Sequence, residues 1–106
     1  MGARSFIRCA ARALVAAVVL DVGPVFAQSE SELLASNCFA CHGPRGMSWT
    51  DIPKLSGLSK DKIVDSFKKF RADALPATIM NRIARGYTDE QVEAIATYIE
   101  KLNKAK

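Results

Sequence analysis

The feature that most constrains this chain is the five-residue stretch Cys38-Phe39-Ala40-Cys41-His42. Two thiols separated by two residues, with an imidazole directly after the second thiol, are typical of a c-type haem attachment site. Haem carries two vinyl groups at a fixed separation on one edge, and each can be captured by a sulfur as a thioether. The histidine that follows is then placed under the porphyrin, where a ring nitrogen can bind the iron. We therefore predict one covalently bound haem c, attached through Cys38 and Cys41, with His42 as an axial ligand of the iron.

Three other uses of these residues are weaker. A thioredoxin-like dithiol lies in a βαβ pattern, and no such pattern surrounds Cys38. A structural zinc site needs four ligands, whereas the chain has one His, and its only other Cys is Cys9. A disulfide between Cys38 and Cys41 would leave the adjacent His42 without a role.

Residues 1–27 have the pattern of a secretory signal peptide. Three arginines precede an apolar run over residues 13–20, and the small-residue sequence at 25–27 is typical of a cleavage site. The apolar run is shorter than the roughly 20 residues that span a bilayer, which disfavours the alternative of an uncleaved membrane anchor. We therefore expect export to the periplasm of a bacterium, with no membrane span after cleavage.

Cleavage after Ala27 would leave residues 28–106 as one small domain of 79 residues. The formal net charge falls from +4 to +2, because Arg4, Arg8, Arg12 and Asp21 leave with the leader. This small charge gives no support to nucleic-acid binding. Cys9 leaves as well, so only the two haem cysteines remain, as suits an oxidising compartment. A core of this size is marginal without a stabilising group, and we expect the protein without haem to be largely unfolded.

Hydrophobic periodicity and capping residues predict an all-α domain. We expect a short helix over residues 28–38, a second over 60–72, a helical turn or two over 78–85, and a last helix over 89–102. Ser29 with Glu32, and Thr88 with Gln91, have the spacing of capping boxes, and Ser59 precedes the second helix as an N-cap. Residues 47–58 contain Pro53 and Gly57 and are expected to be irregular, with Trp49, Ile52 and Leu55 lining the haem edge. For Trp49, packing in the core or at its rim is the favoured alternative. The predicted fold has three main helices and short turns around one haem.

The second axial ligand is predicted to be Met80. Residues 28–106 contain no second His, and lysines are strongly protonated, so a thioether is the natural sixth ligand. Met47 lies only five residues beyond His42 and would need an awkward path to the opposite haem face. Met80 lies in a segment between two helices and can fold over that face. His/Met ligation leaves no open iron position, which favours electron transfer over catalysis at the iron; a small haem enzyme or a gas sensor would need Met80 to dissociate.

With these residues in place, the segment from residue 37 to about 99 resembles a class I cytochrome c domain. More narrowly, it is similar to the haem domains in the cytochrome subunit of flavocytochrome c sulfide dehydrogenase. The strings that carry the resemblance are Asn37-Cys38, Cys41-His42-Gly43, Ile52-Pro53-Lys54-Leu55-Ser56-Gly57-Leu58, Phe67-Lys68-Lys69-Phe70-Arg71 and Ala77-Thr78-Ile79-Met80-Asn81-Arg82-Ile83-Ala84-Arg85-Gly86-Tyr87.

The resemblance implies that the Pro53 carbonyl accepts a hydrogen bond from the other ring nitrogen of His42 and so fixes its orientation. It implies that Pro53, Leu55, Ile79 and Ile83 line the haem pocket. It also implies a function: the haem subunit would accept electrons from a flavin-containing sulfide dehydrogenase and pass them to a downstream cytochrome or oxidase. Better-known subunits of this family carry two haem domains, whereas this chain has one attachment motif. The chain is therefore either a single-haem version of that subunit or a free soluble carrier, which could also serve another sulfur-compound dehydrogenase such as a sulfite-oxidising enzyme.

Overall fold

The computed structural model describes residues 28–105, so the predicted signal peptide lies outside the described residues. The described part contains helices and no strands, which confirms the all-α fold class. Its elements in chain order are α1 (Glu30–His42), η1 (Pro44–Gly46), α2 (Lys60–Arg71), α3 (Met80–Ile83), η2 (Ala84–Gly86) and α4 (Asp89–Lys104). Between residues 28 and 105, no helix combines the length and the apolar character needed to cross a membrane.

The first helix is longer than expected. We predicted that it ends at Cys38, but α1 continues through the attachment motif to His42. Nothing between Cys38 and His42 opposes a helix, and the chain leaves the helix only at Gly43, whose φ of 82° is favourable for glycine. Both cysteines and the histidine therefore lie on the last turns of one helix.

The predicted caps are present, with one difference. Thr88 and Gln91 form the complete capping box of α4: the Gln91 amide donates to Thr88 Oγ1 at 3.2 Å, and the Thr88 amide donates to Gln91 Oε1 at 3.0 Å. Ser29 accepts a hydrogen bond from the Glu32 amide at 3.3 Å, but the Glu32 side chain does not return to Ser29. Glu32 instead lies beside Tyr98 of α4, and burial together with this carboxylate raises the pKa of the Tyr98 hydroxyl. The prediction of a complete capping box at Ser29 and Glu32 is therefore wrong, because the Glu32 side chain interacts with Tyr98 of α4 instead.

The core lies where α1 and α2 pack against α4. The helical spacing predicts a buried stripe of α4 at Val92, Ile95, Ala96, Ile99 and Leu102; the first four are buried, and Leu102, near the end of the helix, is half-buried. Ile63 and Phe67 of α2 are buried against it, as the spacing of the apolar residues in this helix predicts. The buried apolar residues are Ala35, Ile63, Phe67, Ala84, Val92, Ile95, Ala96 and Ile99.

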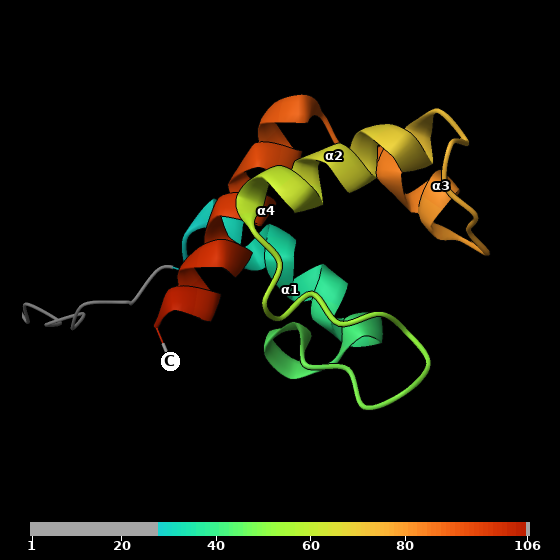
Figure 1. Ribbon diagram of the computed structural model, residues 1–106. Coiled ribbons are helices and arrows are strands. Elements are labelled where there is room, and N and C mark those ends of the chain that lie inside the picture. The colour runs from blue at the N-terminus through green and yellow to red at the C-terminus, as the bar shows by residue number, and fades with distance from the viewer. Residues whose placement is uncertain (1–27, 106) are drawn as a thin grey trace, which may run out of the picture.

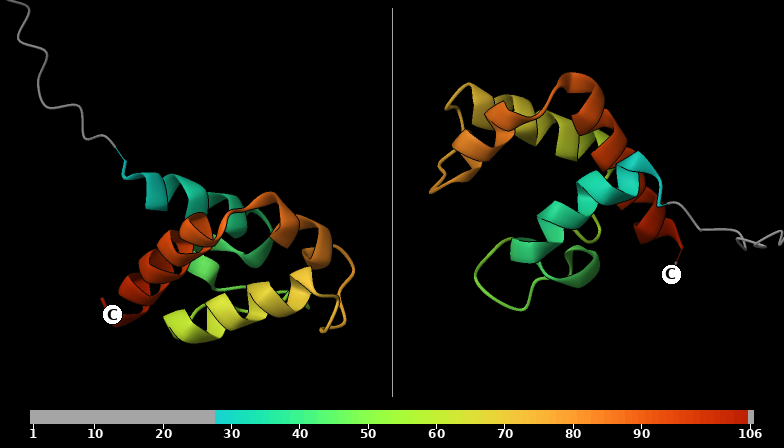
Figure 2. Two further views of the ribbon diagram at one scale, coloured as in Figure 1. Left: turned by 90° about the horizontal axis from the view of Figure 1, so that it is seen from above. Right: turned by 180° about the vertical axis from the view of Figure 1, so that it is seen from behind.

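Residues 47–58 form the expected irregular segment, here called the 47–58 loop. In Figure 1 this loop lies below α2, and α3 lies at the far end of α2. Figure 2 shows from behind that α3 and the 47–58 loop lie at the same end of the molecule, away from the C-terminus. These two segments are separated by α2 along the chain, and their meeting at one end of the helices is what creates the site.

Candidate haem site

A cavity of about 490 Å³ lies between the last turns of α1 and the 47–58 loop on one side and α2 and α3 on the other. All eight site residues predicted from the sequence line it: Cys38, Cys41, His42, Pro53, Leu55, Ile79, Met80 and Ile83. Most of the other lining side chains are apolar, including Ile52, Leu58, Ile63, Phe67, Phe70, Ile95 and Ile99. Residues 38 and 83 are far apart in the sequence, so the cavity exists only because the fold brings these distant segments together.

His42 is held in one orientation by a backbone carbonyl. Its Nδ1 lies 2.5 Å from the Pro53 carbonyl oxygen, and the ring is buried. Because a carbonyl can only accept, Nδ1 is the donor in this contact, and Nε2 is the ring nitrogen left to bind a metal. A partner on the other nitrogen is typical of metal-binding histidines.

Pro53 reaches His42 because the 47–58 loop is closed at its base. The carbonyl oxygen of Gly46 accepts hydrogen bonds from the amides of Leu55 at 2.9 Å and Ser56 at 3.0 Å. These bonds hold Leu55 and Ser56 beside Gly46 of η1, which follows directly on the end of α1. The two sides of the loop are thus fixed, and the Pro53 carbonyl is carried over the imidazole.

The two cysteines are one helical turn apart on α1, so both side chains lie on the same face of the helix. Cys38 is half-buried and Cys41 is exposed, and the two thiols are not joined in a disulfide. Burial raises the pKa of the Cys38 thiol, and the neighbouring Cys41 acts in the same direction, whereas a backbone hydrogen bond lowers it. The cavity wall at Cys38 therefore favours an uncharged sulfur, which a thioether also provides.

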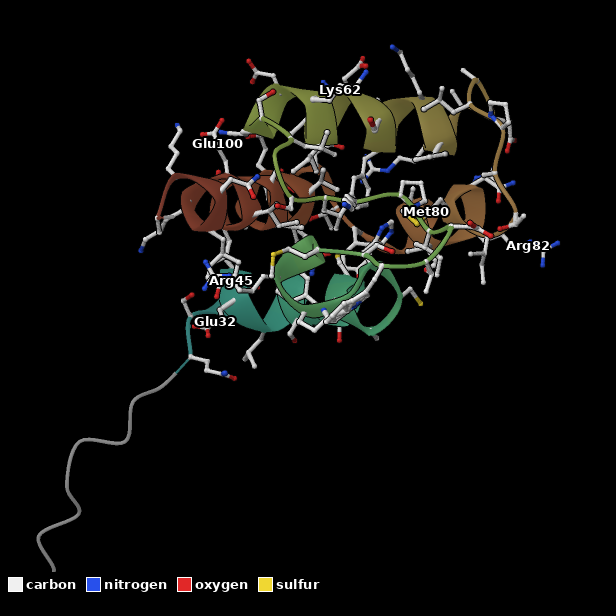
Figure 3. All side chains as sticks on the ribbon, turned by 60° about the horizontal axis from the view of Figure 1, so that its bottom comes forward. Glu32, Arg45, Lys62, Met80, Arg82 and Glu100 are labelled. Atoms are coloured by element: carbon white, nitrogen blue, oxygen red, sulfur yellow. The ribbon has the colours of Figure 1, made fainter. Side chains whose placement is uncertain are left out.

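Met80 is the first residue of α3 and is half-buried at the cavity wall. Figure 3 shows its side chain turned inward toward the 47–58 loop, while Arg82 on the same short helix points outward. The other candidate, Met47, is 39% exposed and does not line the cavity. The fold thus brings one of the two methionine sulfurs of the described chain to the same cavity as His42.

Some lining residues were not identified as site residues from the sequence. Phe67 and Phe70 were predicted only as the apolar stripe of α2, yet both also line the cavity. Tyr87 lines it too, and its ring packs edge-on against Phe67 with 6.1 Å between the centroids. The helical period marks an apolar face but does not say whether a neighbouring helix or a cofactor covers it. Trp49 was expected to line the haem edge or to pack in the core or at its rim; its side chain is 69% exposed and lies outside the cavity lining, so core packing is wrong.

The residues present fit a haem. The cavity is mostly apolar, as suits a porphyrin, and two sulfurs from one helix face lie at one wall. The imidazole, whose Nδ1 contacts the Pro53 carbonyl, and a thioether come from different segments, as axial ligands from two sides require. In the described chain no group of three or more His, Cys, Asp and Glu side chains is placed to hold a metal ion by itself. Fold and cavity together define a small helical domain built around a covalently attached haem.

Comparison with known proteins agrees with this class. The family model for cytochrome c matches residues 31–103, and the chain belongs to the cytochrome c family. Members of this family carry covalently bound haem c, and Cys38 and Cys41 are both present in this chain.

Three curated relatives are named as a subunit or an electron acceptor of a sulfide or thiosulfate dehydrogenase. The chain is 37% identical over 77 residues to the cytochrome subunit of sulfide dehydrogenase from Chlorobaculum tepidum, which covers 73% of this chain and 70% of that protein. It is 36% identical over 70 residues to the thiosulfate dehydrogenase electron acceptor from Thiomonas intermedia, covering 64% of this chain and 32% of that protein. A thiosulfate dehydrogenase electron acceptor from Stutzerimonas stutzeri is 32% identical over 71 residues, and the match covers 33% of that protein. The chain thus spans most of the sulfide dehydrogenase relative but about a third of the two thiosulfate relatives.

Proposed function

We propose that this chain is a periplasmic electron carrier that transfers single electrons through a haem c held between His42 and Met80. The observation that carries the proposal is the convergence of Cys38, Cys41, His42 and Met80 on the walls of one cavity. When bound, the haem iron supplies the one-electron ferric/ferrous couple. The protein attaches the porphyrin through the two sulfurs, holds the imidazole in the ligating tautomer, and offers the Met80 thioether from the other side.

Two protein ligands would leave no iron position for a substrate, so the chain acts as a carrier and not as an enzyme by itself. A thioether opposite an imidazole raises the reduction potential of a haem. The apolar cavity acts in the same direction, because a low dielectric disfavours the more highly charged ferric state.

Replacing Met80 by Ala tests the ligand assignment, with Met47→Ala as the matched control. We expect Met80→Ala to abolish the weak near-infrared sulfur-to-iron band of the ferric protein and to lower its reduction potential. Met47→Ala should keep both properties, because Met47 lies outside the cavity lining. Persistence of the band in Met80→Ala, or its loss in Met47→Ala, would remove Met80 from the iron.

We further propose that the electron donor is a flavin-containing sulfide dehydrogenase, for which this chain is the haem subunit. The identity to a sulfide dehydrogenase cytochrome subunit along 70% of that protein supports this partner. The alternative is a free carrier for another sulfur-compound dehydrogenase, and the two thiosulfate relatives support that reading over about a third of their length.

Purification of the native protein distinguishes the haem subunit from the free carrier. We expect the haem to co-elute with a larger flavoprotein in gel filtration, and sulfide to reduce the haem only when that flavoprotein is present. The intact mass should correspond to residues 28–106 plus one haem, because export removes the leader. A haem protein that elutes alone and is reduced by a thiosulfate dehydrogenase would instead establish the free carrier.

A further inference from the structure

The segment that carries Met80 has few buried contacts of its own. No residue of α3 is buried, and in η2 only Ala84 is. Ile79 is 56% exposed and Ile83 is 37% exposed, and both face the cavity, so their burial depends on what fills it. Met80 itself is half-buried against the core, but hydrophobic packing of its neighbours within the protein contributes little to fixing the segment.

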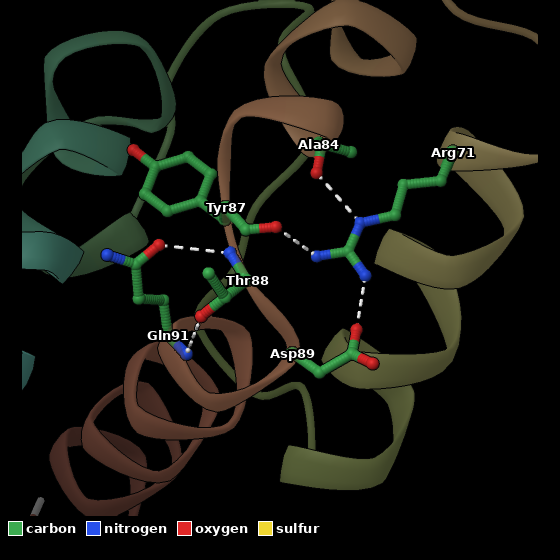
Figure 4. A network of polar contacts seen from close by, with 6 residues as sticks. All are labelled: Arg71, Ala84, Tyr87, Thr88, Asp89 and Gln91. Atoms are coloured by element: carbon green, nitrogen blue, oxygen red, sulfur yellow. Dashed lines mark hydrogen bonds and ion pairs between the residues drawn. The ribbon is translucent and has the colours of Figure 1, made fainter.

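Polar contacts from Arg71, at the end of α2, hold this segment instead (Figure 4). Arg71 Nε donates to the Ala84 carbonyl at 2.9 Å, and one terminal nitrogen donates to the Tyr87 carbonyl at 2.5 Å. The other terminal nitrogen forms an ion pair with Asp89, the first residue of α4. One guanidinium thus joins α2, the chain just after Met80 and the start of α4.

The surroundings of Arg71 strengthen its two part-buried carbonyl contacts, whereas its ion-pair partner Asp89 is 74% exposed. Its side chain is 24% exposed, less than the 38% or more of every other Lys or Arg that forms an ion pair in the described chain. Hydrogen bonds from a charged donor are the strong ones, and partial burial reduces their screening by water. The planar fork reaches three acceptors at once, which a lysine ammonium on a flexible stem cannot reproduce.

The position of these contacts connects them with the ligand. Ala84 lies four residues after Met80, one helical turn further along the same segment, and Tyr87 is itself part of the cavity wall. The helix that carries Arg71 supplies Phe67 and Phe70 to the same cavity. Arg71 therefore fixes the Met80 segment relative to the wall that it faces.

We propose that Arg71 is a positioning residue for Met80, which keeps the thioether in place through the Ala84 and Tyr87 carbonyls. The proposal rests on the His/Met ligation proposed above. A thioether is a weak ligand that competes at high pH with hydroxide and deprotonated lysine, so the equilibrium for its release measures how firmly the protein holds it.

The test is an alkaline titration of the purified ferric holoprotein, followed by the near-infrared sulfur-to-iron band. In Arg71→Lys the charge remains but two carbonyl contacts are lost, and we expect release of Met80 to become about tenfold more favourable, since hydrogen bonds from charged groups are worth a factor of this order. The midpoint of the titration would fall by about one pH unit. Lys69→Gln is the matched control, because it removes an exposed ion pair with Asp65 on the same helix and should leave the midpoint unchanged.

Asp89→Asn is a second variant that keeps both carbonyl contacts of Arg71 and removes only the ion pair between its guanidinium and residue 89. It should lower the midpoint less than Arg71→Lys but more than Lys69→Gln, and it tests the proposal even if Arg71→Lys does not accumulate. Midpoints of Arg71→Lys or Asp89→Asn equal to that of Lys69→Gln would overturn the role of Arg71. Absence of the band in the unmodified protein would instead overturn the ligation by Met80, so the two failures are distinguishable.

Discussion

Gly46 carries the geometry of the site at the scale of a single residue. Its φ is 73°, and its carbonyl closes the 47–58 loop through the amides of Leu55 and Ser56. A Cβ built on Gly46 would lie 2.7 Å from the Cβ of Leu55, closer than two non-bonded carbon atoms normally approach. The absence of a side chain here allows the loop to return against α1, and this return places the Pro53 carbonyl on His42.

We expect Gly46→Ala to lower the free energy of unfolding of the holoprotein by about 1–3 kcal/mol, because it combines an unfavourable φ with a clash against the Cβ of Leu55. Gly86→Ala is the matched control: its Cβ meets nothing within 4 Å, and Gly86 does not have a positive φ. That variant should change the free energy by less than about 1 kcal/mol. Guanidinium denaturation followed at the haem absorbance measures both, and equal effects at the two glycines would contradict this account of the loop.

At the scale of elements, the connection from α2 to α3 is held by side chains and not by proline alone. The second helix, expected over residues 60 to about 72, ends at Arg71, and Asp73 then adopts a φ of 54°. The Asp73 carboxylate accepts hydrogen bonds from Asn81 at 3.1 Å and from Arg85 at 2.6 Å. The turn after α2 is thus tied directly to the segment on which Met80 lies.

These contacts lower the pKa of Asp73 below its ordinary value of 3.8, mainly through the hydrogen bond from Asn81 and then through Arg85. A carboxyl whose pKa is lower in the folded protein contributes stability above its unfolded pKa and loses it as the pH falls through the folded value. The contribution of Asp73 is therefore present above about pH 4 and disappears in more acidic solution. We expect Asn81→Ala to raise the pKa of Asp73 toward its ordinary value, as measured by NMR titration of the carboxyl carbons in the ferrous protein.

Asp65 provides the internal control for this titration. Its pKa is lowered by the hydrogen bond from Lys69, which Asn81 does not touch, so it should be the same in both proteins. If the pKa of Asp73 does not change in Asn81→Ala, the connection between the turn and α3 is not made as described.

Across the whole molecule, the core is one small cluster that borders the cavity. Among the described residues, only Ile95 and Ile99 are large side chains with almost no exposure, and both also line the cavity of about 490 Å³. Chains of this size bury too little surface to be stable without help from a bound group or a cross-link. A haem with two covalent bonds would fill the cavity and complete the core.

We therefore expect the protein without haem to be largely unfolded. A Cys38→Ala/Cys41→Ala variant, produced without haem, should show weak far-ultraviolet circular dichroism and no cooperative thermal transition, whereas the holoprotein should melt cooperatively. A sharp transition in the haem-free variant would show that the helices form a sufficient core by themselves.

Much of this architecture follows from local sequence. The Cys38–His42 motif identifies the haem, the caps at Ser59 and Thr88 place the starts of two helices, and the period of α4 identifies its buried face. Met80 follows by elimination among the side chains that could ligate iron. Except for Met80, which follows from the residue content of the chain, each of these inferences depends on residues within a few positions of one another, where spacing and chemistry alone limit what the backbone can do.

Only the tertiary structure decided how these parts meet. The Arg71 fork spans 13 residues to Ala84, and Asn103 donates to the Leu58 carbonyl across 45 residues. Apolar periodicity could not show that Phe67, Phe70 and Tyr87 face a cavity, or that Trp49 remains in solvent. The sequence by itself therefore determined the attachment chemistry and the helices, while the contacts that position Met80 depended on the packing of distant segments, because no local pattern specifies which carbonyl a distant side chain will reach.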